Sequence, residues 1–68
     1  MKRGQMIWVR DDEEDDLQVR FFCEYTRNDK NEPAVYASVT REEAEANICR
    51  FDPWKYYRPV EAKDLEVP

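Results

Sequence analysis

Hydrophobic and polar positions alternate through the first half of the chain, a pattern typical of β-strands with one buried face. The alternation is clearest from Leu17 to Thr26, where the odd-numbered positions hold Leu, Val, Phe, Cys and Tyr. We expect these odd-numbered side chains to face the core, and the even-numbered ones, Arg20 and Phe22 among them, to lie on the second face of the sheet. A shorter run of β-branched and aromatic residues over 6–10 predicts a preceding strand.

A third strand is predicted over 34–39, with Val35, Ala37 and Val39 on the core side and Tyr36 on the other. The stretch between the second and third strands is rich in Asn, Asp and Lys and ends in a proline, which is typical of a turn. The sequence therefore predicts two successive antiparallel hairpins.

A helix is indicated by the tetrapeptide 40–43, which has the form of a capping box. We expect the helix to begin at Arg41 and to end near Phe51, because Pro53 disfavours helical geometry just before it. The apolar stripe that would pack on the sheet is narrow and consists of Ala44, Ile48 and Phe51.

The C-terminal segment is less regular. Asp52 is placed to cap a short helical turn that begins at Pro53. Residues 57–62 predict an edge strand or an extended strap, since an edge strand tolerates Pro59.

These elements place the chain in the α+β class. We expect a small antiparallel three- to four-stranded sheet with one helix packed on one face, in the order β-β-β-α and then a C-terminal strand or strap. The length of 68 residues leaves room for a single domain over 1–68, with 1–5 and 63–68 expected to be frayed.

Charge is concentrated in one run of six acids. The net charge is -5 and the run carries -6, so the rest of the chain is almost neutral. Because the run lies directly between the first two strands, we expect it to connect them as a hairpin loop. In an extended run, same-face carboxylates would lie about 6.6 Å apart, close to the phosphate spacing of a single nucleic-acid strand. The candidate partner-binding strip is Asp11, Asp12, Glu13, Glu14, Asp15 and Asp16; the alternative is a solvated loop.

Several functional classes are excluded by composition. The chain has no histidine and its one glycine is Gly4, which excludes imidazole catalysis and glycine-rich phosphate loops. Six contiguous acids also lack the spaced ligands and the glycine of an EF-hand loop. We therefore expect no enzymatic activity, no metal site and no cofactor. Cys23 and Cys49 have no CxxC spacing, and we expect two free thiols in a cytoplasmic protein without a membrane segment; the alternative is a single structural disulfide.

The second face of the sheet is a second candidate surface. It would bring together aromatic and arginine side chains, a composition enriched in binding hot spots. The residues that we assign to this patch are Trp8, Arg20, Phe22 and Tyr36. The alternative is that the segment 54–57 folds over this face and makes a second small core.

In composition, this small, acidic, histidine-free chain resembles the short inhibitors that bacteriophages make against host defence nucleases, although no motif carries residue roles across. The acidic run suggests a non-catalytic binding protein that mimics nucleic acid and occupies a basic, nucleic-acid-handling surface of a host protein. One alternative is an assembly module that forms a homodimer through its sheet aromatics. Another is a small single-stranded nucleic-acid binder, but net acidity disfavours direct nucleic-acid binding.

Overall fold

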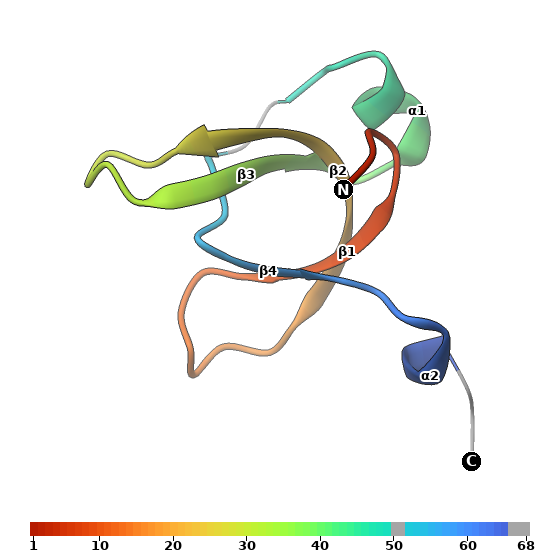
Figure 1. Cartoon of the computed structure of the whole chain (residues 1–68), viewed down its shortest axis with the longest axis horizontal. Helices are drawn as coiled ribbons and strands as arrows, with labels where there is room; N and C mark the ends of the chain where they lie inside the picture. Colours follow the sequence, from red (N-terminus) through yellow and green to blue (C-terminus); the bar gives the residue numbers. More distant parts are fainter. Residues whose placement is uncertain (50–51, 66–68) are drawn as a thin grey trace.

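The computed structural model of the chain describes residues 1–49 and 52–65. Four antiparallel strands form one sheet in the spatial order β3-β2-β1-β4, with a short helix after the third strand (Figure 1). This is the α+β arrangement expected from the sequence, with the C-terminal segment forming a strand. The elements are β1 (Met6–Arg10), β2 (Gln18–Arg27), β3 (Pro33–Ser38), α1 (Arg41–Glu45), β4 (Tyr56–Pro59) and α2 (Ala62–Leu65).

The sheet curls until its two edges meet. Trp54, two residues before β4, forms an antiparallel bridge with Val35 of β3, which is at the opposite edge. Two backbone hydrogen bonds hold this bridge, Val35 N to Trp54 O at 2.9 Å and Trp54 N to Val35 O at 2.8 Å. The strands therefore surround the core almost as a small barrel, and Figure 1 looks into the ring that they form. The expected helical turn after Asp52 is absent, because the backbone there is extended into this bridge.

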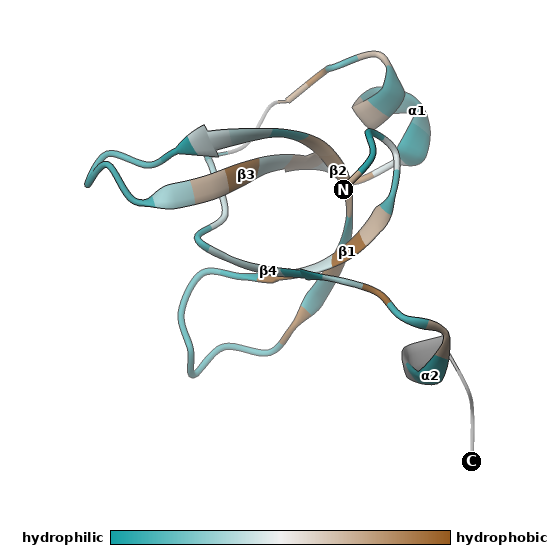
Figure 2. Ribbon diagram, viewed as in Figure 1, coloured by the Kyte–Doolittle hydropathy of each residue, from teal (hydrophilic) through white to brown (hydrophobic). Residues whose placement is uncertain are grey.

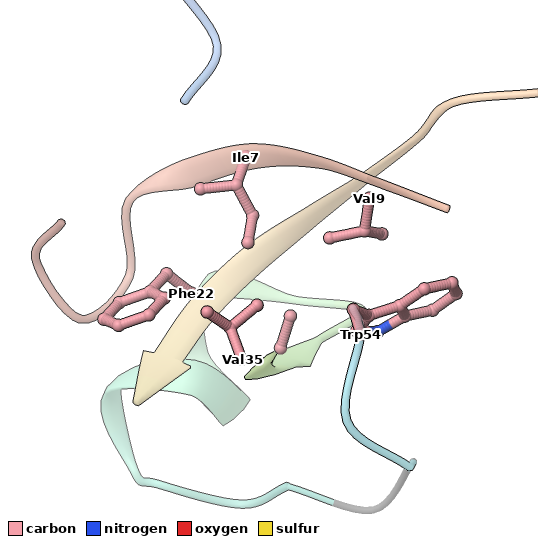
Figure 3. Close-up of a cluster of buried hydrophobic side chains, with 6 residues drawn as sticks. Ile7, Val9, Phe22, Val35 and Trp54 are labelled. Atoms are coloured by element: carbon pink, nitrogen blue, oxygen red, sulfur yellow. The ribbon is translucent and has the colours of Figure 1, made fainter. Parts of the chain in front are cut away.

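The core lies inside this ring. Ile7 and Val9 of β1 are fully buried and lie across from Val35 and Trp54, with Phe22 closing one end (Figure 3). Ala37 completes the cluster, and Met1 and Tyr57 pack against it. The hydropathy colouring in Figure 2 shows the same division, with brown segments on β1 and β3 and teal loops around them.

The inward face of β2 differs from the expectation. Phe22 is in the core, whereas Leu17, Val19 and Tyr25 are 38%, 36% and 58% exposed. For Val19 the cause is register: Ile7 pairs with Arg20, so before the bulge the even-numbered positions share the inner face with the β1 core residues. A bulge between Phe22 and Glu24 then shifts the pairing by one residue, so Tyr25 pairs with the core residue Val35 and is exposed although it lies on the inner side. On β3, Val35 and Ala37 are buried as expected, but Val39 lies beyond the strand and is 51% exposed.

Helix α1 begins as expected and ends earlier. The Thr40 hydroxyl accepts from the backbone N–H of Glu43 at 3.2 Å, which confirms the N-cap. The helix ends at Glu45 because Asn47 adopts a left-handed conformation, with φ of 59°. The N–H groups of Asn47 and Ile48 bond to the carbonyls of Ala44 and Glu43, which is a Schellman C-cap.

Of the two members of the expected helix stripe that the structure describes, one is buried. Ala44 has no exposed surface and packs between the helix and the sheet, while Ile48 lies beyond the helix and is 39% exposed. The expected third member, Phe51, lies outside the described residues.

The segments near the two ends of the chain that were expected to fray have defined structure as far as residue 65, and residues 66–68 lie outside the described part. Gly4 N donates to Phe22 O, and Phe22 N donates to Gln5 O, both at 2.8 Å, so the segment expected to fray is bonded to β2. Gly4 has φ of 85°, a conformation that glycine adopts without strain. Near the other end, 62–65 forms α2. No helix among residues 1–49 and 52–65 is long and apolar enough to cross a membrane.

Candidate functional site: an acidic groove beside an aromatic sheet face

The acidic run forms the connection between β1 and β2, as expected. All six side chains are exposed. The run is a turn and not an extended strip, because Asp15 N donates to Asp12 O at 3.0 Å. The Arg10 guanidinium donates to Glu13 O at 2.8 Å and ties the loop to the end of β1. The regular 6.6 Å spacing expected for an extended strand therefore does not apply to this loop.

A shallow groove of about 430 Å³ brings further carboxylates next to this loop. It lies between the start of the acidic loop, the turn that joins β2 to β3, and the segment leading to β4. The carboxylates that line it are Asp11, Asp12, Asp29, Glu32 and Asp52. Lys30 and Lys55 also line it, so anionic groups outnumber cationic ones. We call the groove together with the loop 11–16 the acidic end.

The turn after β2 is shaped by one asparagine. Asn28 Oδ1 accepts from the backbone N–H groups of Lys30 and Glu32, at 3.0 and 2.9 Å. Asn31 has φ of 61°, which reverses the chain, and its N–H bonds to Asn28 O. This turn holds Asp29 and Glu32 at the groove.

An ion pair crosses the groove. Lys55 Nζ lies 2.6 Å from Glu32 Oε2. The hydrogen bond from Lys55, with a second one from Asn28, lowers the pKa of Glu32 below its ordinary value of 4.5. The hydrogen bond to Glu32 in turn raises the pKa of Lys55 above 10.5. Lys55 thus neutralises one carboxylate of the acidic end.

The carboxylates of the acidic end are spread out and do not converge on one point. Within residues 1–49 and 52–63, whose side chains the structure describes, no group of three or more Asp, Glu or Cys residues is arranged to hold a metal ion. The geometry is suited to an extended cationic surface and not to a single bound ion.

The outer face of β1, β2 and β4 presents a second surface. Residues directly opposite each other in an antiparallel sheet point to the same side, and Ile7 and Val9 point inwards. The intervening β1 positions and their partners therefore point outwards. They form three rows: Met6 beside Phe21, Trp8 between Val19 and Arg58, and Arg10 beside Tyr56. We call these residues, with Arg41, the outer face.

Each large ring of the outer face has a guanidinium over it. The Arg58 Cζ atom is 5.8 Å from the Trp8 ring centre, and Arg10 is 5.7 Å from Tyr56. Arg41, from the first turn of α1, lies 5.2 Å from Phe21. These distances are typical of cation–π interactions, so the outer face combines flat apolar rings with positive charge. Arg10 belongs to both surfaces, because it also holds the acidic loop.

The structure does not bring the four patch residues predicted from the sequence together. Trp8 lies on the outer face, but Phe22 is only 3% exposed and belongs to the core. Arg20 is on the inner face, where its guanidinium lies 5.9 Å from the Trp54 ring. Tyr36 pairs with Glu24 and is separated from Trp8 by about 16 Å along β2. The reversed inner face of β2 explains the positions of Arg20 and Phe22.

Sequence reasoning missed the ring residues Phe21 and Tyr56 and the groove residues Asp29 and Asp52. The aromatic pair Tyr56–Tyr57 could have indicated a strand in which one of the two rings points outwards, because successive side chains of a strand point to opposite faces. The groove residues carried no local signal, since they meet through pairing between distant segments.

Comparisons with known proteins give no further guide to this site. The chain matches no family model, no curated protein and no solved structure. Its function therefore has to be argued from its own residues.

Proposed function

We propose that this chain is a non-catalytic binding protein whose acidic end docks on a basic, nucleic-acid-handling surface of a partner protein. The observation that carries the proposal is the groove, where carboxylates from two other segments line a surface together with Asp11 and Asp12 of the exposed acidic loop. A solvated loop alone would not gather Asp29 and Asp52 beside it.

The acidic end would act through long-range attraction. A dense local charge speeds the encounter with an oppositely charged surface and makes association dependent on salt. Because the loop is turned, mimicry of a nucleic acid would rest on charge density and not on regular phosphate spacing. A protein held in this way would block the nucleic-acid site of its partner and act as an inhibitor, as do the phage-made proteins that it resembles in composition.

The outer face would supply affinity that salt does not screen. Trp8 and Tyr56 offer flat apolar surface beside the acidic end, and Arg10 joins the two regions. Aromatic and arginine residues are frequent binding hot spots. The partner would therefore carry a basic patch next to apolar or acidic groups that fit these rings and guanidiniums.

Self-association through the sheet aromatics, the alternative considered above, is disfavoured by the geometry. Phe22 is in the core, and a symmetric dimer through the outer face would place two surfaces against each other that each carry the charges of Arg10 and Arg58. Like charges facing each other across an interface cost free energy.

The test compares two variants with the same change in net charge. The first carries Asp11→Asn, Asp12→Asn and Asp29→Asn in the groove. The second carries Glu24→Gln, Glu42→Gln and Glu45→Gln, which are exposed acids away from the groove. Each tagged protein is used to capture partners from a bacterial cell lysate at low salt, and bound proteins are then eluted with excess duplex DNA or RNA.

We expect the unaltered chain and the second variant to retain a partner that nucleic acid displaces, and the first variant to retain much less of it. Equal retention by the two variants would show that the acidic end has no specific role. Elution by salt but not by nucleic acid would contradict docking at a nucleic-acid site. Binding of the purified chain itself to short single-stranded DNA or RNA would favour the nucleic-acid binder instead.

A further inference from the structure

The two cysteines of the chain lie in the same small region on the helix side of the sheet. Cys23 is the extra residue of the β2 bulge, and it is 2% exposed. Its Sγ atom lies 3.1 Å from the Ser38 hydroxyl oxygen. The Ser38 hydroxyl donates its single proton to Ile48 O at 2.6 Å, so the Cys23 thiol is the donor to Ser38.

The same hydrogen bonds bring Cys49 close. Ile48 is bonded through its carbonyl to Ser38 and through its N–H to Glu43, and Cys49 is the next residue. The Cys49 thiol is half-buried and lies within interaction range of the Cys23 thiol. The two cysteines are 26 positions apart in the sequence, which did not indicate that they are close. Their proximity depends on the early end of α1, which the left-handed Asn47 causes.

We propose that Cys23 and Cys49 are a disulfide-forming pair, free in the reduced protein and joined by exchange with a small-molecule disulfide such as oxidised glutathione. The half-exposed Cys49 thiolate would attack the glutathione disulfide, release one glutathione and form a mixed disulfide. The Cys23 thiolate would then attack Cys49 Sγ and release the second glutathione. Two protein thiols are thus oxidised to one disulfide, while one glutathione disulfide is reduced to two thiols.

The surroundings make this exchange slow at neutral pH. Burial, the neighbouring Cys23 thiol and the Glu24 charge together raise the pKa of Cys49 to about 12, against the opposing effect of Arg3. The attacking species is the thiolate, so the rate should rise about tenfold per pH unit below this value. The bond would fasten the segment after α1 to β2, and a crosslink closing a loop of this size raises the melting temperature by on the order of 10 °C.

The experiment follows the intact mass of the full chain, at low protein concentration, in oxidised glutathione at about pH 8.5 until the mass stops changing. We expect a monomer that has lost two hydrogen atoms, and a tryptic digest that joins the peptides 21–27 and 42–50. The rate should be lower at neutral pH, and the oxidised protein should melt at a higher temperature. Cys49→Ser, a nearly isosteric change at a half-buried position, is the control that should abolish the internal bond.

Three results would overturn the proposal. These are two thiols that stay free, stable glutathione adducts on one or both cysteines, or disulfides between two chains. The proposed function is tested separately, because the pair lies on the helix side of the sheet and none of its residues lines the acidic groove.

Discussion

The inner face of β2 can be tested by the same substitution at two adjacent positions, Phe22→Leu and Phe21→Leu. Phe22 is 3% exposed in the core, whereas Phe21 is half-buried on the outer face under Arg41. Truncating a buried Phe to Ala costs about 3–5 kcal/mol, and Leu restores roughly half of the lost carbons, so Phe22→Leu should cost about 2 kcal/mol. Phe21→Leu removes some packing on the outer face and one cation–π interaction, so it should cost about 0.5–1 kcal/mol of stability.

These differences are measurable in a domain of this size. Its total stability should be about 3–10 kcal/mol, so both variants are expected to remain folded. Urea unfolding followed by tryptophan fluorescence should show a midpoint about 2 M lower for Phe22→Leu and less than about 1 M lower for Phe21→Leu, taking a slope near 1 kcal/mol per M. An equal or larger loss in Phe21→Leu would refute the assigned register, and with it the outer face.

The remaining predictions concern single contacts. Lowering the pH through and below 4.5 should reduce the melting temperature, because the hydrogen bond from Lys55 lowers the pKa of Glu32 in the folded protein, and protonation of Glu32 removes the stabilising charge. In Glu32→Gln the decrease in melting temperature over this pH range should be smaller. Asn47→Gly should leave the stability unchanged or slightly higher, while Asn47→Ala should cost about 1 kcal/mol in thermal unfolding, since only a residue that tolerates positive φ fits there. Gly4→Ala should cost about 1–2 kcal/mol, because φ is positive and the new methyl group would lie 3.0 Å from Glu45 Cγ; a neutral result would mean that this turn relaxes freely.

Local patterns were sufficient to predict the existence and order of the main elements. The alternation and turn residues located the first three strands within one residue of their observed ends, and the capping box located the start of α1. The early end of the helix was also encoded locally, by the left-handed Asn47, but Ile48 and Phe51 suggested a longer apolar stripe.

The face of β2 could not be decided from its own sequence. Apolar residues occupy both parities, with Val19 and Phe21 on one and Phe22 on the other, so only the pairing with β1 and the bulge at Cys23 determine which set is buried. The acidic loop, in contrast, could be predicted from the local sequence, since a recognisable strand flanks it on each side. Its partners in the groove, Asp29 and Asp52, depend on the Val35–Trp54 bridge, which joins segments 19 positions apart.

The bridge between Val35 and Trp54 also has a consequence for how the chain folds. β1, near the N-terminus, is a central strand that receives one of its two neighbours, β4, only from residues about 50 positions later. During synthesis, the first three strands emerge early but leave β1 and β3 with unpaired backbone edges until the segment from Trp54 onwards is available. A chain truncated before Trp54 would therefore expose two unpaired strand edges that can pair with other chains. We expect it to aggregate and not to remain as a smaller stable domain.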